Sequence, residues 1–400
     1  MRILHVLAQL PSKTGSGVYF SNIIKGLKNK YEQACVFGFQ DDFYYDILNR
    51  EFQYAVEFNT ERMPFNIVGM SDEMPYASTR YCDLTEEMQD IWNINFSQIL
   101  HRALSEFKPD IIICHHLWML TSLVIDKAVD KKVIGICHGT DIRQCEKNPE
   151  LKEKYLKNIN KLDHIFALSE LQVPEIKRIY SADDEKIIVM GGGFDQNIFY
   201  RPEKKEKNDE IKIVYAGKIA EAKGVYEFIE AVKKIEDGLE IKIIGAKDDE
   251  QEKELRQIVK GHENFEIMQV IPQIELANIF RESDIFVLPS YFEGLGLVAI
   301  EALACGMRVV SSEIEGLINL LGEDIINSGA IEIVELPRLQ KVDKPLKEDI
   351  DGYILRLKEA IEKQVDRIRS GKEIDEKIRD SIDDHSWARI LSDIEKIIEK

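Results

Sequence analysis

An apolar strand leads into a glycine-rich turn and then into a helix in the segment Asp284-Ile-Phe-Val-Leu-Pro-Ser-Tyr-Phe-Glu-Gly-Leu-Gly-Leu-Val-Ala-Ile-Glu-Ala-Leu-Ala-Cys-Gly306. A turn that feeds a helix start offers unpaired backbone N–H groups and the positive end of the helix dipole, so it attracts a phosphate or a sugar oxygen. Glu293 lies at the turn and Glu301 about a helical turn further in, so their carboxylates can hold different parts of one polar ligand. First-turn glutamates are also common simply because they complement the dipole. The segment therefore predicts a ligand site at a strand end.

The alternation of apolar strand and amphipathic helix continues in both directions from this segment. In the second half, the expected strands are Ile211–Ala216, Leu239–Ile244, Phe265–Val270, Asp284–Leu288 and Arg308–Ser311. In the first half, they are Arg2–Ala8, Ala34–Phe39, Asp110–Cys114, Lys132–Cys137 and His164–Leu168. Apolar strands separated by helices indicate parallel strands covered on both faces. We therefore expect an α/β protein with two doubly wound, Rossmann-like domains and a ligand at the carboxyl ends of the strands.

One charged stretch, Tyr200–Glu210, has a proline and no apolar periodicity, which favours a linker. We expect a first domain over residues 1–200, a second over 201–380 and a terminal helix over 381–400. The segment Phe52–Glu87 is too long for an ordinary connection and is rich in Met, Pro, Tyr and Ser. Its aromatic residues argue against plain disorder, so we interpret it as an excursion that faces an acceptor or a protein partner.

The composition limits the class of protein. Across 400 residues, 44% apolar content suffices for two cores. The formal charge of −19, from 53 basic against 72 acidic residues, argues against nucleic-acid binding. We expect neither a membrane span nor a signal peptide, and the six cysteines form no Cys-x-x-Cys pair. A cytoplasmic protein fits this pattern, and a local basic face would leave peripheral association with the inner face of the membrane open.

A second glycine turn, Lys13-Thr-Gly-Ser-Gly-Val-Tyr-Phe20, follows the first strand and opens a helix. Strand, glycine turn and helix together can hold an anion on backbone amides. The motif is neither Gly-x-Gly-x-x-Gly nor a Walker A loop. A purely structural tight turn is an equal alternative here.

Histidines follow two other strands. In Ile136-Cys-His-Gly-Thr-Asp-Ile-Arg143, His138 and Asp141 would project from the strand end, where a histidine could donate to a sugar or phosphoryl oxygen or transfer a proton. A histidine bonded within its own loop is the alternative. The adjacent His115 and His116 should point apart in an extended chain, so we expect at most one of them at the ligand. The candidate acceptor-binding residues are His116, Asp141 and Arg143.

Two lysines follow the first strand of the second half, in Val214-Tyr-Ala-Gly-Lys-Ile-Ala-Glu-Ala-Lys-Gly224. Lys218 and Lys223 suit a diphosphate, because a pyrophosphate-like leaving group gains charge as its bond breaks. Two solvated surface lysines are the alternative. We expect no metal site, and we interpret Asp349-Ile-Asp351 as a capping pair at a helix start.

With these motifs, the chain resembles the retaining glycosyltransferases of GT-B fold, the group related to sucrose-phosphate synthase and bacterial mannosyltransferases. The matching motifs run in family order over about residues 1–312 and are Thr14-Gly-Ser-Gly17, His138-Gly-Thr-Asp141, Gly192-Gly-Phe-Asp195, Gly217-Lys-Ile…Lys223-Gly224 and Pro289-Ser…Glu293-Gly-Leu-Gly…Glu301-Ala…Cys305-Gly306. The resemblance implies two Rossmann-like domains that face each other across a cleft, with a C-terminal helix that crosses back to the first domain.

The resemblance also implies a role for each motif. Glu301 would hydrogen-bond the nucleotide ribose, and Glu293 would hold the donor sugar. Lys218 and Lys223 would neutralise the diphosphate, and His138 would contact the transferred sugar. The further donor-binding residues implied are Gly15, Ser16, Gly17, Gly217, Gly294, Leu295, Gly296 and Leu297. The catalytic residues implied are His138, Glu293, Lys218 and Lys223.

Three positions depart from the family pattern. Lys218 stands where the family more often has Arg; it keeps the charge but loses bidentate geometry. The motif Gly192-Gly-Phe-Asp195, where the chain crosses between the two expected domains, begins with Gly-Gly in place of Asn-Gly. After Ser312, the stretch Glu313–Leu346 follows a poorer strand and helix pattern, so the sequence leaves the end of the second domain open.

The resemblance thus implies a retaining, metal-independent hexosyltransferase without a cofactor. Its donor would be a nucleotide-diphosphate sugar and its acceptor a hydroxyl of a glycan, a lipid-linked intermediate or a small molecule, as in polysaccharide biosynthesis. In this family, retention is usually explained by front-face attack with the leaving phosphate as the base. Two alternatives remain at this point: a nucleotide-sugar epimerase on the same fold, and a non-catalytic partner subunit of a transferase.

Overall fold

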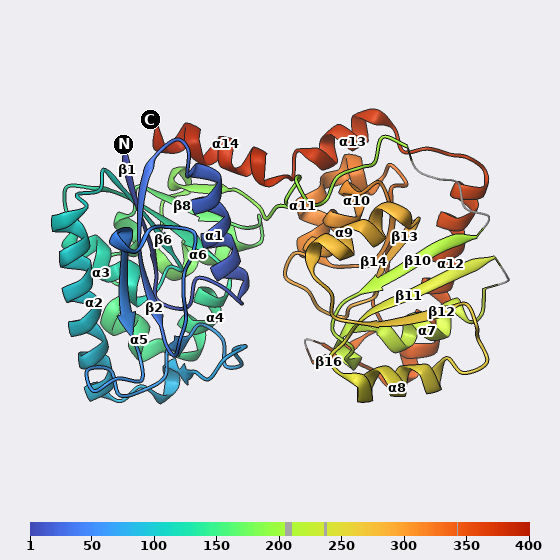
Figure 1. The fold of residues 1–400 in the computed structure, drawn as a ribbon, viewed down its shortest axis with the longest axis horizontal. Coiled ribbons are helices and arrows are strands. Elements are labelled where there is room, and N and C mark those ends of the chain that lie inside the picture. Colours follow the sequence, from blue (N-terminus) through green and yellow to red (C-terminus); the bar gives the residue numbers. More distant parts are fainter. Residues whose placement is uncertain (205–209, 236–237, 342) are drawn as a thin grey trace. The chain divides into compact units, whose positions relative to one another are not determined.

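The chain forms two compact units, each built on its own parallel sheet (Figure 1). The computed structural model describes residues 1–204, 210–235, 238–341 and 343–400. The first unit comprises Met1–Gly191 with Leu391–Lys400, and the second comprises Gly192–Ile390. The expected linker Tyr200–Glu210 lies in part outside the described residues, because it includes residues 205–209.

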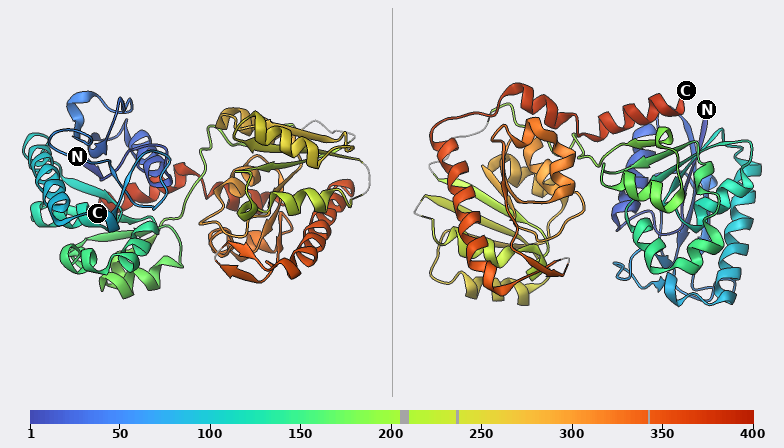
Figure 2. Two further views of the ribbon diagram at one scale, coloured as in Figure 1. Left: turned by 90° about the horizontal axis from the view of Figure 1, so that it is seen from below. Right: turned by 180° about the vertical axis from the view of Figure 1, so that it is seen from behind.

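The first unit has a seven-stranded parallel sheet in the order β3-β2-β1-β6-β7-β8-β9. Its strands are β1 (Arg2–Leu7), β2 (Glu32–Phe39), β3 (Gln53–Glu57), β6 (Ile111–His115), β7 (Lys132–Cys137), β8 (His164–Ala167) and β9 (Ile187–Val189). Its main helices are α1 (Gly15–Leu27), α2 (Glu86–Glu106), α3 (Met119–Lys127), α4 (Thr140–Lys147), α5 (Pro149–Tyr155) and α6 (Gln172–Tyr180). Helices lie on both sides of the sheet (Figures 1 and 2).

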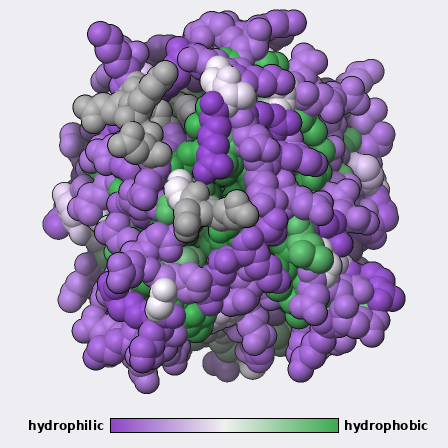
Figure 3. Space-filling view, turned by 90° about the vertical axis from the view of Figure 1, so that its right-hand side faces the viewer, coloured by the Kyte–Doolittle hydropathy of each residue, from purple (hydrophilic) through white to green (hydrophobic). Residues whose placement is uncertain are grey.

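The second unit has a six-stranded parallel sheet in the order β12-β11-β10-β13-β14-β15. Its strands are β10 (Ile211–Ala216), β11 (Leu239–Ala246), β12 (Phe265–Gln269), β13 (Ile285–Leu288), β14 (Arg308–Ser312) and β15 (Ile331–Val334). Its helices are α7 (Val225–Val232), α8 (Asp249–Ile258), α9 (Gln273–Glu282), α10 (Leu297–Ala304), α11 (Glu315–Ile326), α12 (Ile350–Arg369) and α13 (Glu376–Asp383). The face in Figure 3 is mostly hydrophilic, as the 31% charged residues require.

The chain order reverses beside one strand in each sheet. β1 lies between β2 and β6, and β10 lies between β11 and β13. At such a switch point, the connections leave in opposite directions, so the loops at the carboxyl ends open a crevice for a ligand. The loops after β1 and β6 therefore meet at one edge of the first unit. Those after β10 and β13 meet at one edge of the second.

The two doubly wound units that the sequence predicted are confirmed, and each expected strand is present with ends within two residues. Three edge strands were missed: β3, β9 and β15. Each is short and only partly buried, so its alternation is weak in the sequence.

The segment Phe52–Glu87 contributes mainly to the core of the first unit. Its first residues form β3 on the sheet edge, and a small parallel pair, β4 (Val68–Gly69) and β5 (Thr79–Arg80), follows. Nine of its apolar side chains are buried in the core: Tyr54, Val56, Phe58, Met63, Ile67, Val68, Met70, Tyr81 and Leu84. Packing within its own unit thus accounts for most of the apolar residues that suggested an outward-facing excursion.

The expected capping pair at Asp349-Ile-Asp351 is wrong. Asp349 stands just before α12, but its side chain makes no capping hydrogen bond. Its carboxylate instead accepts from Arg338, from Nε at 2.7 Å and from Nη2 at 3.0 Å. The Arg338 backbone N–H also donates to this carboxylate, at 3.2 Å, so Arg338 and not the start of α12 satisfies it.

The end of the chain forms α14 (Trp387–Ile398), whose last part packs on the first unit. Glu395 forms an ion pair with Lys30 at 2.7 Å, and Tyr31 donates to Glu399 at 2.6 Å. A Cβ on Gly26 would lie 2.1 Å from Leu391, so α1 and this helix are in close contact. Among the described residues, no helix combines the length and apolar composition needed to cross a bilayer.

Candidate functional site

The turn Glu293-Gly-Leu-Gly296 of the second unit, called the glutamate turn below, is held by an ion pair. Glu293 Oε1 accepts from Lys223 Nζ at 2.8 Å and from Ser290 Oγ at 2.9 Å. Both charged side chains remain about a quarter exposed, at 28% for Lys223 and 25% for Glu293. A ligand can therefore reach both groups, and the lysine has further N–H donors to offer it. Ser290 was not among the sequence candidates, although it directly follows the proline that ends the strand.

The backbone of the same turn is shaped by glycines. Gly296 adopts φ 62°, the left-handed conformation that favours glycine, and it precedes the first residue of α10. A Cβ on Gly294 would meet nothing within 4 Å, so its main chain is open to a ligand. Gly316, in α11, fits against Gly294 from the other side, because its Cβ would lie 1.9 Å from the Gly294 carbonyl oxygen. Gly316 thus supports the turn, a contact that only the fold reveals.

Glu301 lies within α10 in a partly buried position. Among the described residues, its carboxyl group has no hydrogen-bond or ion-pair partner. Burial raises its pKa to about 8 from the ordinary value of 4.5. At neutral pH, the group therefore holds its proton and can both donate and accept a hydrogen bond.

The two lysines occupy different environments. Lys223 lies in the loop after β10, which is joined to the loop after β13 by a hydrogen bond from Tyr291 N to Ala222 O at 3.1 Å. Gly224 permits this approach, since its Cβ would lie 2.0 Å from the Pro289 carbonyl oxygen. Lys218 is exposed, and its carbonyl accepts from the buried Tyr215 hydroxyl at 2.7 Å. The fold thus brings Lys223 and Glu293 together, while Lys218 extends into solvent beside Gly217.

The glycine turn of the first unit caps a helix. Thr14 precedes α1, and its hydroxyl accepts from Gly17 N at 3.1 Å. Gly17 is tightly packed, because its Cβ would lie 2.6 Å from Ser12 N, whereas a Cβ on Gly15 would meet nothing within 4 Å. Ser16 is buried, and Gln9 Nε2 donates to its hydroxyl at 2.8 Å. Of the three expected phosphate-facing residues, Gly15 is the one with open main chain.

Three imidazoles gather at the carboxyl ends of β6 and β7. His115 Nδ1 lies 3.2 Å from His138 Nε2, and their rings are stacked with centroids 5.4 Å apart. The His116 ring centroid lies 4.7 Å from that of His138, and Tyr19 meets His138 edge-on at 5.4 Å. Burial lowers the pKa of His138 to about 3 and lowers the pKa values of His115 and His116 well below 6.5. The cluster is therefore uncharged at neutral pH.

The prediction that at most one of His115 and His116 would be at the ligand edge rested on strand alternation. His116 has φ 72°, so the chain is no longer extended there and the alternation fails. Both rings are buried, at 3% and 4% exposure, and both contact His138. His116, expected to bind the acceptor, instead packs inside the cluster.

Asp141, another residue expected to bind the acceptor, does not project from the strand end as the sequence predicted. It is fully buried, and its Oδ2 accepts from Leu117 N at 2.9 Å and from His138 N at 3.2 Å. Desolvation raises its pKa, although these hydrogen bonds oppose the shift. Asp141 thus ties the loop after β6 to the loop after β7 and orients the backbone of His138. Arg143, on α4, is exposed.

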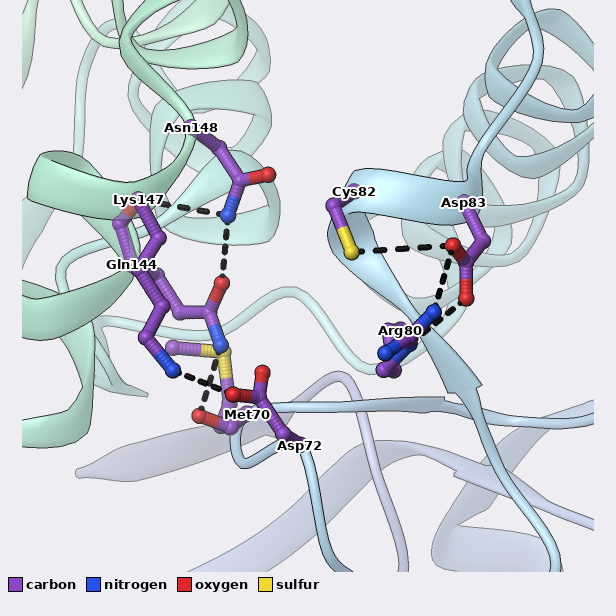
Figure 4. A network of polar contacts seen from close by, with 8 residues as sticks. All are labelled: Met70, Asp72, Arg80, Cys82, Asp83, Gln144, Lys147 and Asn148. Carbon is purple, nitrogen blue, oxygen red and sulfur yellow. Dashed lines mark hydrogen bonds and ion pairs between the residues drawn. The ribbon is translucent and has the colours of Figure 1, made fainter.

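Polar contacts join the excursion to this edge of the first unit (Figure 4). On the α4 side, Gln144 Nε2 donates to Met70 O at 3.0 Å, and Lys147 pairs with Asp72. On the strand side, Met70 N donates to Gln9 Oε1 at 3.3 Å. Gln9 therefore bridges the excursion and the glycine turn, a role with no signal in the sequence beyond its place after β1.

No group of three His, Cys, Asp or Glu side chains suited to a metal ion occurs among the residues that the structure describes. The second unit brings together cationic and carboxylic groups, which suit a ligand that carries an anion and several hydroxyls. The first unit, by itself, brings together three imidazoles.

Two adjacent parts of the chain, together residues 81–332, match known protein families. Residues 196–332 match the family "Glycosyl transferases group 1", and residues 81–197 match "Glycosyltransferase Family 4". These ranges contain the glutamate turn and the His138 loop, respectively.

Curated relatives match over part of their length. A D-inositol 3-phosphate glycosyltransferase of Arthrobacter sp. (strain FB24) is 28% identical over 177 residues, which are 40% of this chain and 42% of that protein. A putative teichuronic acid biosynthesis glycosyltransferase, TuaC of Bacillus subtilis (strain 168), is 25% identical over 225 residues, 54% of this chain and 56% of that protein. The chain thus spans about two fifths to about half of these relatives.

A solved structure matches over nearly the whole chain. Sucrose-phosphate synthase from Thermosynechococcus elongatus aligns with a TM-score of 0.68 at 15% identity, over 100% of this chain and 98% of that one. At this identity, the likeness concerns the fold, which is the GT-B fold. From its two sheets, its motifs and these matches, the chain belongs to the GT-B-fold glycosyltransferases of group 1 and family 4.

Proposed function

We propose that this chain transfers a hexose from a nucleoside-diphosphate sugar to a hydroxyl of an acceptor, with retention of anomeric configuration. The observation that carries the proposal is the arrangement around the start of α10. An accessible Lys223–Glu293 pair, an open main chain at Gly294 and the half-buried Glu301 surround one helix start. A diphosphate, a sugar and a ribose each find a chemically matched group there.

The diphosphate would be neutralised by the lysines. Lys223 Nζ carries three N–H groups, so it can keep its contact with Glu293 and still donate to a phosphate oxygen. The exposed Lys218 adds a second positive charge at the same strand end. As the bond to the leaving diphosphate breaks, the negative charge grows, and both lysines stabilise it more in the transition state than in the ground state.

The carboxyl groups would hold the two hydroxylated ends of the donor. Glu293 would accept from hydroxyls of the sugar. Glu301, protonated at neutral pH, can donate to one ribose hydroxyl and accept from the other, which suits a vicinal diol. An ionised Glu301 would offer only acceptors, so its raised pKa supports this assignment.

The proposed reaction needs no protein nucleophile. The acceptor oxygen bonds to the anomeric carbon on the face from which the diphosphate leaves. The bond between that carbon and the phosphate oxygen breaks, and the acceptor proton passes to the leaving phosphate oxygen. No metal ion is assigned a role in this proposal.

The test is a donor and acceptor panel. The full chain is incubated with UDP-, GDP- and ADP-hexoses, alone and with glycans, lipid-linked sugars or D-inositol 3-phosphate, the last chosen from the name of a relative. Released nucleoside diphosphate is measured, and the anomeric configuration of the product is read by NMR. We expect release that depends on an acceptor and a retained configuration.

The other outcomes of this test are specific. Isomerisation of the donor sugar without an acceptor would indicate an epimerase. Failure to bind any nucleotide would favour a non-catalytic subunit. An inverted product would contradict the proposed course of the reaction.

A further inference from the structure

The histidine cluster of the first unit contains nitrogens that the proposed function does not use. His115 Nε2 and His116 Nε2 are buried and find no hydrogen-bond partner among the described residues. A neutral imidazole has one N–H donor and one lone-pair acceptor, so an unpartnered nitrogen can be either. An unpartnered buried donor is the less favourable of the two, because orphaned buried N–H groups are rarer in proteins than orphaned acceptors.

His5 shows how this unit leaves a ring nitrogen without a partner. His5 Nε2 lies 2.8 Å from Gln33 Oε1, and Gln33 Nε2 donates to Ile24 O at 3.0 Å. The second bond fixes the orientation of the amide, so Oε1 must accept and His5 Nε2 must carry the proton. The buried, unpartnered Nδ1 of His5 is therefore a lone pair. The same unit thus tolerates a buried imidazole acceptor without a partner.

The contact between His115 and His138 can be read in the same way. One of the two nitrogens, His115 Nδ1 or His138 Nε2, must donate across the 3.2 Å separation. If His138 donated, His115 would carry its own proton on Nε2 as a buried N–H without a partner. If His115 donates from Nδ1, its orphaned Nε2 is a lone pair, as in His5. The second arrangement is the one that burial favours.

We propose that His115 is a positioning residue that fixes His138 as the Nδ1–H tautomer. His138 Nε2 is then occupied as an acceptor, and its Nδ1–H is the only ring group left for a ligand. His138 is also the member of the three that is partly exposed. The ring therefore presents a neutral hydrogen-bond donor to an oxygen acceptor of the ligand, such as a sugar or phosphoryl oxygen.

In the proposed function, on which this step rests, the tautomer prevents His138 from acting as a base. A ring whose remaining nitrogen already carries a proton cannot take the proton of an acceptor hydroxyl. His138 would therefore bind and orient, and the proton would go to the leaving phosphate oxygen. The low pKa of His138, which burial lowers to about 3, agrees with this role, because imidazolium formation is disfavoured in the cluster.

The direct test is a measurement of ring nitrogen protonation. The full chain is labelled with ¹⁵N-histidine, and ring ¹⁵N shifts and their two-bond couplings to ring protons are recorded at pH 7. Signals are assigned with His138→Gln and His115→Phe. We expect Nδ1–H for His115 and His138 and Nε2–H for His5. An Nε2–H or a doubly protonated His138 in the unaltered chain would overturn the proposal, whether or not any transfer activity is found.

A pair of variants separates hydrogen bonding from packing. His115→Phe keeps an aromatic ring against Phe20 and His138 but has no donor, whereas His115→Gln has an amide donor. In the Phe variant, we expect the His138 ring signals to move toward a mixture of tautomers and kcat/KM to fall about tenfold, since one hydrogen bond is lost.

The Gln variant should recover part of both changes, and His101→Gln, at an exposed site on α2, should change neither. Equal loss in the Phe and Gln variants, with the tautomer of His138 unchanged, would show that His115 acts only by packing. Wild-type tautomers as expected but no transfer with any donor would leave this assignment standing and count against the proposed function.

Discussion

In the second unit, the Lys223–Glu293 pair at the ligand edge is charged and reachable, whereas in the first unit the imidazoles at the ligand edge are neutral and mostly buried. Lys223 and Glu293 neutralise each other within 2.8 Å and stay about a quarter exposed. The imidazoles of His115, His116 and His138 instead contact one another, with pKa values held below the ordinary range by burial. One edge is thus suited to an anion with hydroxyls. The other is suited to directed hydrogen bonds with a neutral group.

Mutations should therefore affect the two edges in different ways. A charged group in a solvated loop affects the ligand and little else, because water and counterions compensate its removal. A group in a buried neutral network affects the fold as well, because its partners are left without hydrogen bonds. The four predictions below test this contrast.

Glu301→Ala should have the largest effect on ligand binding. If Glu301 binds the ribose as proposed, its loss should weaken nucleoside diphosphate binding by about 10- to 100-fold, from roughly 1.5–3 kcal/mol. Isothermal titration calorimetry measures the affinity, and circular dichroism checks that the fold is kept. Glu263→Ala, at an exposed site of the same unit, is the control. Unchanged affinity in the Glu301 variant would contradict its assignment to the nucleotide.

The pKa of Glu301 predicts a pH-dependent difference in stability. Because the folded chain keeps this proton up to about pH 8 while the unfolded chain releases it near 4.5, the folded state binds more protons in between. The contribution of Glu301 to the free energy of unfolding should therefore fall as pH rises from about 5 to 8. Glu301→Gln lacks that loss, so its stability relative to the wild type should rise over this range and level off above it. Urea unfolding at pH 5, 6.5 and 8 measures the difference; a constant offset would contradict the raised pKa.

Gly15 and Gly17 form a matched pair in the first unit. Gly17→Ala places a Cβ 2.6 Å from Ser12 N and 2.8 Å from Leu10 O, both backbone atoms, and overpacking of this kind costs about 1–3 kcal/mol. Gly15→Ala meets open space, so its stability should be unchanged or slightly higher. Thermal unfolding of both variants tests this, and equal stability would show that the turn is not tightly packed.

Lys223→Ala should have a smaller effect that is confined to the donor. It removes one of the two cations proposed to face the diphosphate and leaves Glu293 bonded only to Ser290 among the contacts described. We expect about a tenfold loss in kcat/KM and little change in stability, since the pair is partly exposed. Lys260→Ala, an exposed lysine of the same unit, is the control. A large loss of stability would show that the ion pair is structural.

The central strands of each sheet could be predicted from the sequence, but three of the four edge strands could not. β7 and β10 coincide with the expected ranges, because fully buried parallel strands are continuous apolar runs. β3, β9 and β15 were missed, since a short edge strand owes its place to the neighbour that it pairs with. The partner of Asp349 could not be predicted from local sequence either, because the fold brings Arg338 close to it.

The candidate site shows the same division. The charged turn around Glu293 could be put forward as a ligand site from residue type and spacing, because a strand, a glycine turn and a helix start are local features. The burial of Asp141 and the left-handed conformation of His116 were not, because they depend on two loops meeting. Ser290 and Gly316 likewise gained their roles from contacts across loops.

The sequence by itself determined the α/β class and the two sheets, and it named the residue types that we propose for the donor site. These follow from apolar periodicity and from motifs that lie within a few residues of one strand end. Only the tertiary structure decided which groups are paired, buried or protonated. Burial by neighbouring elements raises the pKa of Glu301, and the rings of His115 and His138 meet because two parallel strands end side by side. Such properties depend on the surroundings of a side chain, which residues distant in the sequence provide.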